Sequence, residues 1–175
     1  AILVICSATS TITDTAIALG KTYMCMKDSE QPCEQCKNCV LIGKNEHPDF
    51  IHFDASSLAK DTIKVIDIKL LSNFFKLTSN QGGNRIFSLG FLENVSLTIK
   101  NSLLKTIEEP PENLKVILYT KSVSSVPLTI KSRCQIIDLR KDIETEVGAS
   151  MKIFSELDEK LVPLLFKGEN IKVSD

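Results

Sequence analysis

The stretch Ala1-Ile2-Leu3-Val4-Ile5-Cys6 opens the chain and decides its fold class. Its uninterrupted apolar run, Ile2–Ile5, is typical of a short strand that is buried on both faces, as in a parallel sheet. Helical patterns separate this run from later ones, so the alternation predicts an α/β three-layer sandwich with a five-stranded parallel sheet and right-handed crossovers. The four further runs are Phe50–Phe53, Ile86–Leu89, Val116–Tyr119 and Gln135–Leu139.

Three longer helices are expected between these strands. Asp14 is the predicted N-cap of the first helix, and Asp61 or Thr62 that of the second. The third ends before Pro110-Pro111, because proline cannot continue a helix. Their apolar residues recur at helical spacing: Ile17, Leu19, Tyr23 and Met24; Ile63, Ile66, Leu70, Phe74 and Leu77; Val95, Ile99, Leu103 and Ile107.

The pattern changes after Leu139. We therefore expect the α/β domain to span residues 1–140, and residues 141–175 to begin a small helical lid domain that is truncated. Two short helices are predicted there, at 143–154 and 157–166, with Gly168 as a stop signal. Since the chain lacks an initial methionine and opens directly in a strand, we expect it to be a fragment of a longer protein.

The composition is that of an ordinary globular protein. Hydrophobic residues make up 43% and charged residues 25% of the 175 residues. Lys and Arg (21) nearly balance Asp and Glu (22), so no strong field draws the isolated chain to nucleic acid or to a membrane. The apolar opening is too short for a membrane span or a signal peptide. A reducing cytoplasm is the expected location.

Four closely spaced cysteines, Cys25, Cys33, Cys36 and Cys39, form a predicted metal-binding module over residues 25–39. The spacing is C-x7-C-x2-C-x2-C, and paired C-x-x-C turns commonly deliver four thiolates to one zinc ion. An iron–sulfur cluster and disulfides are the alternatives. Four protein ligands close the coordination sphere of zinc, so the expected Zn²⁺ is structural and not catalytic.

Three further motifs name a family. They are Asn101-Ser102-Leu103-Leu104-Lys105-Thr106-Ile107-Glu108-Glu109-Pro110-Pro111, then Ser132-Arg133-Cys134, and His47-Pro48-Asp49. Together with the cysteine module, they resemble the delta-prime group of bacterial DNA polymerase III clamp-loader subunits, relatives of the AAA+ proteins. The resemblance covers Ile2 to about Leu139. It departs from the family in the seven-residue gap after Cys25, where eight residues are commoner.

The residues of a phosphate-binding loop are missing. Such a loop needs a glycine-rich turn after the first strand and a lysine, but the segment Cys6–Asp14 contains no glycine. Aligned on the strand, Ile12 stands at the lysine position. Gly20-Lys21-Thr22 imitates the end of this motif but lies well inside the first helix. Residues 90 and 91, a glycine and a phenylalanine, occupy the positions of the two magnesium-site acids, with Glu93 displaced by two.

The resemblance therefore implies a subunit that does not hydrolyse ATP itself. It implies that Arg133 of the S-R-C motif acts as an arginine finger, a cation that reaches the ATP of a neighbouring subunit. Thr120 matches the family's sensor position. The implied partners are gamma/tau-type and delta-type subunits, the sliding clamp and primed DNA. For Lys100 and Lys105 we expect a solvated helix face instead of DNA contacts.

The sequence is also compatible with two other functions. One is an active gamma/tau-type ATPase subunit of the same machine, which the missing phosphate loop disfavours. The other is a free-standing, zinc-dependent nucleic-acid-binding module, which the near-neutral charge disfavours.

Overall fold

A computed structural model describes residues 1–6, 9–27, 32–54, 73–76, 79 and 83–140. The predicted cap at Asp61 or Thr62, most of the second predicted helix and the whole predicted lid at 141–175 lie outside these residues. Residues 73–76 are helical. The other elements are β1 (Ile2–Ile5), α1 (Thr9–Met24), α2 (Lys37–Gly43), β2 (Phe50–Asp54), β3 (Arg85–Gly90), η2 (Leu92–Asn94), α4 (Leu97–Glu108), β4 (Leu114–Thr120), η3 (Val123–Ser125), α5 (Leu128–Lys131) and β5 (Gln135–Asp138).

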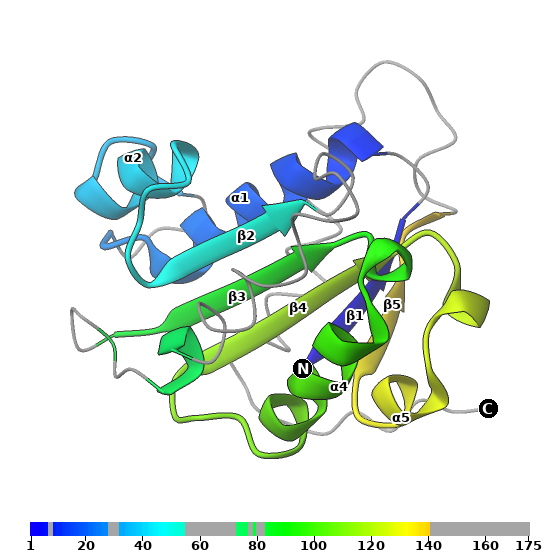
Figure 1. The fold of residues 1–175 in the computed structure, drawn as a ribbon. Helices are drawn as coiled ribbons and strands as arrows, with labels where there is room; N and C mark the ends of the chain where they lie inside the picture. Colours follow the sequence, from blue (N-terminus) through cyan, green and yellow to red (C-terminus); the bar gives the residue numbers. More distant parts are fainter. Residues whose placement is uncertain (7–8, 28–31, 55–72, 77–78, 80–82, 141–175) are drawn as a thin grey trace.

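The five strands form one sheet in the order β2-β3-β4-β1-β5, and every neighbouring pair is parallel. This confirms the predicted α/β fold with its five-stranded parallel sheet. β1 lies inside the sheet, with Leu3 opposite Leu118 of β4 and Ile136 of β5. The chain moves toward the β2 edge after β1 and back toward β1 after β3. Right-handed crossovers therefore place α1 and α4 on opposite faces of the sheet (Figure 1).

The core fills the space between the sheet and these helices. The central strands β1, β3 and β4 are buried almost throughout, which is why they read as continuous apolar runs. The largest side chains that are fully buried are Tyr119, Phe50, Phe87, Phe91, Leu3, Ile12, Leu19, Ile42, Ile86, Leu92, Ile99 and Leu103.

The edge strands differ from the expectation that every strand is buried on both faces. In β5 only Ile137 is buried, whereas Ile136 and Asp138 are exposed. In β2 Phe50 and His52 are buried, whereas Ile51, Phe53 and Asp54 are half-buried. Each edge strand has one neighbour only, so less of its surface is covered.

The predicted cap at Asp14 is wrong. α1 begins at Thr9, and Asp14 is an exposed residue within the helix. The reason is Ile12, which is buried and continues the apolar face of the helix one turn toward its N-terminus, in line with Ala16 and Leu19. Burial of Ile12 stabilises the additional turn.

Helix α4 ends where the sequence predicts, but Val95, which was expected in it, lies before its N-cap. The Ser96 hydroxyl caps its N-terminus by accepting a hydrogen bond from the Ile99 N–H. The helix ends at Glu108, and Glu109 before Pro110 leaves the helical region, with φ −129° and ψ 73°. Lys105 is exposed, but the expected solvated face is wrong for Lys100, which is 8% exposed. The amphipathic Lys100 side chain packs its stem against the core.

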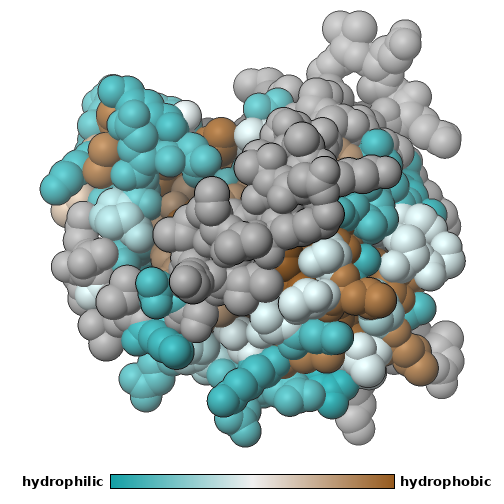
Figure 2. Space-filling model, viewed as in Figure 1, coloured by the Kyte–Doolittle hydropathy of each residue, from teal (hydrophilic) through white to brown (hydrophobic). Residues whose placement is uncertain are grey.

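The surface is uneven on the face seen in Figure 2. Residues over α2 are mostly hydrophilic, whereas hydrophobic residues gather in the region of α4. Leu97 and Leu128, the first residues of α4 and α5, are exposed large apolar residues. No helix in the described part of the chain is long and apolar enough to cross a membrane.

Candidate functional site

The four cysteines of the predicted metal module converge in the structure. Their sulfur atoms lie within 4.8 Å of one another. A tetrahedron with Zn–S bonds of about 2.3 Å has sulfur atoms about 3.8 Å apart, so the cluster is close to that geometry. Cys25 follows the end of α1, Cys36 caps α2, and Cys39 lies in its first turn. The donor set fits a metal ion that prefers soft thiolate ligands.

Backbone N–H groups point at two of the sulfurs. Cys33 Sγ accepts a hydrogen bond from the Cys36 N–H, and Cys36 Sγ accepts one from the Cys39 N–H. Hydrogen bonds from the Gln35 and Cys36 backbone lower the pKa of Cys33. Burial alone would raise the pKa of Cys36, but backbone and thiol hydrogen bonds outweigh burial and lower it to about 6. Burial raises that of Cys39 to about 12. Negative charge in the cluster is thus favoured at Cys33 and Cys36.

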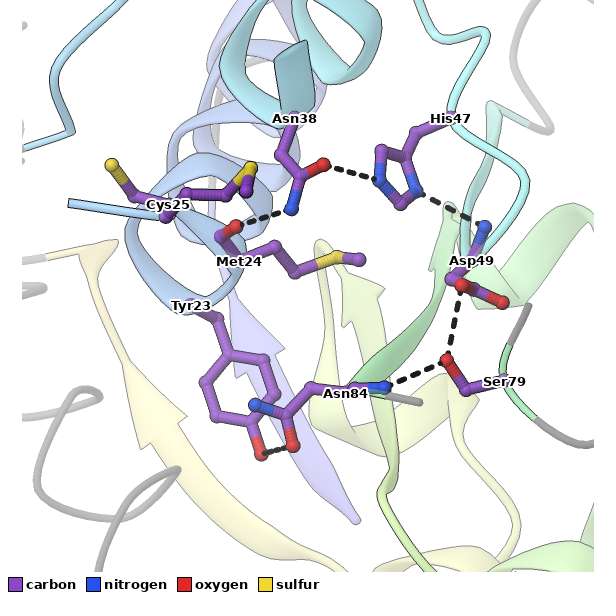
Figure 3. Close-up of a pocket in the computed structure, with 10 residues that line it drawn as sticks. Tyr23, Met24, Cys25, Asn38, His47, Asp49, Ser79 and Asn84 are labelled. Carbon is purple, nitrogen blue, oxygen red and sulfur yellow. Dashed lines mark hydrogen bonds between the residues drawn. The ribbon is translucent and has the colours of Figure 1, made fainter. Parts of the chain in front are cut away.

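The His47-Pro48-Asp49 motif supports this module without belonging to the cysteine cluster. The His47 ring accepts a hydrogen bond from the Asp49 N–H at Nδ1 and faces Asn38 Oδ1 through Nε2 at 3.2 Å (Figure 3). The Asn38 amide in turn donates to the Met24 carbonyl, so the relay joins α2 to the end of α1. Burial lowers the pKa of His47, which favours the neutral ring. These residues line a pocket of about 250 Å³.

The carboxyl end of β3 is filled with apolar atoms where an ATPase would hold phosphate and magnesium. Ile12, at the lysine position, is 1% exposed, and its Cγ2 lies 3.1 Å from where a Cβ on Gly90 would stand. Phe91, at the second acid position, is also 1% exposed and has a left-handed backbone, with φ 56°. We call Ile12, Gly90 and Phe91 the closed end of the sheet. It offers no cation or carboxylate of its own to a nucleotide.

The displaced acid, Glu93, is bound within the chain. Its carboxylate accepts hydrogen bonds from the Thr120 hydroxyl at 2.9 Å and from the Lys121 N–H at 3.2 Å. Thr120, at the sensor position, is fully buried. The hydroxyl that the resemblance assigns to sensing nucleotide therefore has a partner in its own chain.

Two buried polar groups were not predicted from the sequence. His52 of β2 lies 2.9 Å from the Ser88 hydroxyl and 3.4 Å from that of Thr13. Arg85 forms a buried ion pair with Asp49, and its guanidinium lies 4.2 Å from the Phe74 ring centroid. A histidine and an arginine inside apolar strand patterns were the only signals, and their partners lie far away in the sequence. His52 thus links β2 to β3 and α1, and Arg85 links β3 to the residue just before β2.

Arg133 lies at the surface, between α5 and the start of β5. It follows α5, whose C-cap is Ser132, and its side chain is 39% exposed. Its Nε lies 2.7 Å from Glu108 Oε1 at the end of α4, and its Nη1 donates to Thr129 O and Ser132 Oγ. Cys134 is half-buried and packs against the core, and burial raises its pKa to about 11. The structure thus presents the arginine of the S-R-C motif on a short helical element.

The predicted site residues therefore form two separate groups. One is the cysteine cluster, with all four members together, and the other is Arg133 with Glu108. The parallel five-stranded sheet with helices on both faces defines an α/β three-layer domain with an AAA+-like fold. Among solved structures, a DNA polymerase III gamma subunit-related protein from Thermotoga maritima has the same fold. It matches 95% of this chain and 52% of that protein with a TM-score of 0.51 at 16% identity.

Comparison with known sequences narrows this class. The family described as DNA polymerase III, delta subunit, matches residues 1–143. The DNA polymerase III subunit delta' of Bacillus subtilis is 31% identical over 71% of this chain, and that of Haemophilus influenzae 32% over 70%. The tau subunit of Escherichia coli is 34% identical over 65%. This chain belongs to the DNA polymerase III delta-subunit family.

The chain spans only part of these relatives. The matched residues cover 37% of each of the two delta' proteins and 17% of the tau protein. The match to the family ends at residue 143, next to the last described residue, Arg140.

Proposed function

We propose that this chain is part of a delta-prime-type subunit of a DNA polymerase III clamp loader that does not hydrolyse ATP itself. In this role it assembles with gamma/tau-type and delta-type subunits in the cytoplasm. Through the assembly it helps to place the sliding clamp on primed DNA. Its contribution to chemistry is Arg133, which completes the ATP site of a neighbouring subunit.

The observation that carries this proposal is the closed end of the sheet. Phosphate binding needs a cation and open backbone donors, and magnesium needs carboxylates. Ile12 packs against Gly90 instead, and Phe91 is buried beside them. A nucleotide would have to displace the buried Ile12 and Phe91 side chains from the core. The Glu93 carboxylate next to Thr120 would in addition repel phosphate.

The surface around Arg133 supports a role in another subunit's site. Leu128 is 76% exposed at the start of the helix that presents Arg133. An exposed leucine beside a half-exposed arginine fits a surface that a protein partner covers, because interfaces are enriched in arginine and in apolar contacts. The planar guanidinium is suited to charge that develops on a transferred phosphoryl group.

The test is ATP turnover by a reconstituted loader that contains the full-length Arg133→Ala subunit. Arginine fingers contribute rate factors on the order of a thousand, so turnover at one ATP site should fall by about that factor. Lys131→Ala, which removes a cation from the same short helix, is the matched control and should keep wild-type turnover. Wild-type turnover and clamp loading by Arg133→Ala loaders would show that the finger role is wrong.

We further propose that Cys25, Cys33, Cys36 and Cys39 hold one structural Zn²⁺. The proposal rests on the convergence of four sulfurs and on the N–H···S hydrogen bonds. Zinc would link the end of α1 to the start of α2, and its binding would contribute to local folding. Elemental analysis of protein purified without added metal should give about one zinc per chain, and Cys36→Ser should lose it. Iron, or two disulfides without metal, would contradict the assignment.

The active gamma/tau-type ATPase is the second candidate, because relatives of that name also match. The gamma subunit of Buchnera aphidicola (strain Bp) is 34% identical over 73% of this chain. Ile12, Gly90 and Phe91 disfavour it, since that chemistry needs a lysine and two carboxylates. Membership of the DNA polymerase III family likewise disfavours a free-standing zinc-dependent nucleic-acid-binding module.

A further inference from the structure

Arg133 contacts its own chain through only one edge of its guanidinium, which consists of Nε and Nη1. A guanidinium has five N–H donors: one on Nε and two on each Nη. Nε lies 2.7 Å from Glu108 Oε1, and Nη1 donates to Thr129 O at 3.0 Å and to Ser132 Oγ at 3.2 Å. Among the described residues, Nη2 has no partner. Three contacts therefore hold the Nε–Nη1 side and leave Nη2 available to a partner.

Two of these three partners are local, and Glu108 is the distant one. Thr129 and Ser132 lie within four residues of Arg133 and move with α5. Glu108 belongs to α4, a separate helix of twelve residues that packs on the core through Ile99, Leu103 and Ile107. The Glu108 contact thus ties the arginine to a rigid part of the domain and fixes its direction.

The position of Glu108 is not explained by the stability of α4. It is the last residue of the helix, where the partial negative charge of the helix C-terminus disfavours a carboxylate. Arg133 offsets this charge. The following Glu109-Pro110-Pro111 ends the helix at this residue, because a residue before proline avoids the helical conformation and proline cannot extend a helix. The Glu-Glu-Pro-Pro segment therefore ends α4 at the residue whose carboxylate contacts Arg133.

We infer that Glu108 is a positioning residue, which holds the Arg133 guanidinium so that its Nη2 edge faces the ATP site of the neighbouring subunit. This inference rests on the proposed function of Arg133. Both side chains of the pair are partly exposed, 39% for Arg133 and 46% for Glu108. A pair so accessible to water contributes little to folding. The contact instead orients the Arg133 guanidinium before the subunits bind to each other.

The experiment measures kcat for ATP in the reconstituted loader that carries full-length variants of this subunit. Glu108→Ala should lower kcat about fivefold, because a loosely held arginine is less often in place. Glu108→Gln should lose less than Glu108→Ala, since its amide oxygen keeps a polar atom of the same size next to Nε, although the charge is lost. The KM for ATP and the thermal stability of the subunit should stay unchanged. Glu109→Ala, one residue further on and also exposed, is the matched control and should behave as wild type.

The double variant separates positioning from a merely structural role. If Glu108 acts only through Arg133, Glu108→Ala should cause no further loss in the Arg133→Ala background. Wild-type kcat in Glu108→Ala, or an equal additional loss without Arg133, would overturn the inference while leaving the role of Arg133 in place. If Arg133→Ala alone has no effect on kcat, the proposed function itself fails, and the role of Glu108 fails with it.

Discussion

The closed end of the sheet and the surface around Arg133 have opposite characters within one domain. At the closed end, Ile12 and Phe91 are buried, and Gly90 leaves room for the isoleucine. At the surface, Arg133 and Glu108 are charged, partly exposed and paired with each other. The first place is thus packed like a core, whereas the second presents charged groups at the surface.

This difference separates positions that bear on the packing of the domain from positions that are open to a partner. An empty phosphate-binding loop would leave a polar, hydrated cleft beside β1 and β3. Apolar side chains at the ligand positions turn that cleft into core, where burial contributes about 25 cal/mol per Å² of apolar surface. We expect substitutions at the closed end to change stability, and substitutions around Arg133 to change function in the assembly.

The largest change in stability should come from Ile12→Lys. It would restore the residue type of a phosphate loop, but it buries an ammonium group without a carboxylate partner, because Gly90 and Phe91 replace the acids. We expect a loss of about 3–5 kcal/mol in the free energy of unfolding, measured by denaturant titration. Arg133→Ala should change the same quantity by less than about 0.5 kcal/mol. Equal effects at both positions would break the comparison.

A smaller loss is expected for Gly90→Ala. The added Cβ would lie 3.1 Å from Ile12 Cγ2 and 3.5 Å from the Phe53 carbonyl oxygen. Overpacking of this kind costs about 1–2 kcal/mol. Gly83→Ala is the matched control, because nothing lies within 4 Å of its added Cβ. In an Ile12→Ala background the cost of Gly90→Ala should shrink, and an unchanged cost would show that the two residues do not meet.

The smallest effect concerns pH. Burial lowers the pKa of His52, which lies beside Thr13 in the helix that carries Ile12. The unfolded chain therefore takes up a proton more readily than the folded one. The contribution of neutral His52 to the free energy of unfolding should be complete above the pKa of the unfolded chain, about 6.5. It should decrease as the pH falls toward the lower pKa of His52 in the folded chain. His52→Gln should flatten this dependence in denaturant titrations between pH 7 and 5. An unchanged pH dependence would mean that His52 is not held neutral.

Much of the fold could be predicted from the sequence, because its signals are local. Ile2–Ile5 was predicted to the residue, and Pro110-Pro111 marked the end of α4. The start of α1 was misplaced, since Asp14 is a good cap residue but burial of Ile12 favours an earlier start. Lys100 was expected in solvent, yet its long stem packs against the core. Tertiary packing decided both outcomes, and a local pattern does not contain it.

The sites divide in the same way. Spacing alone predicted that the four cysteines would meet, because they lie within one short segment. The pairing of Arg133 with Glu108 joins residues 25 positions apart, and that of Thr120 with Glu93 joins residues 27 apart. Both acids stand in segments that the sequence analysis names, but nothing in the sequence predicts their partners. Only the packing of α4 and η2 against the sheet brings them to their partners.

We propose that this chain contributes to ATP chemistry only in trans, because Ile12, Gly90 and Phe91 stand where an ATPase needs a lysine and two acids. The most direct test is calorimetric titration of the full-length subunit with magnesium-ATP. We predict no saturable binding at micromolar concentrations, since the buried Ile12 and Phe91 stand at the positions of the lysine and of one of the acids. One site per chain with a micromolar Kd, lost when Thr13 beside Ile12 is replaced, would contradict the claim and reveal a divergent but working phosphate loop.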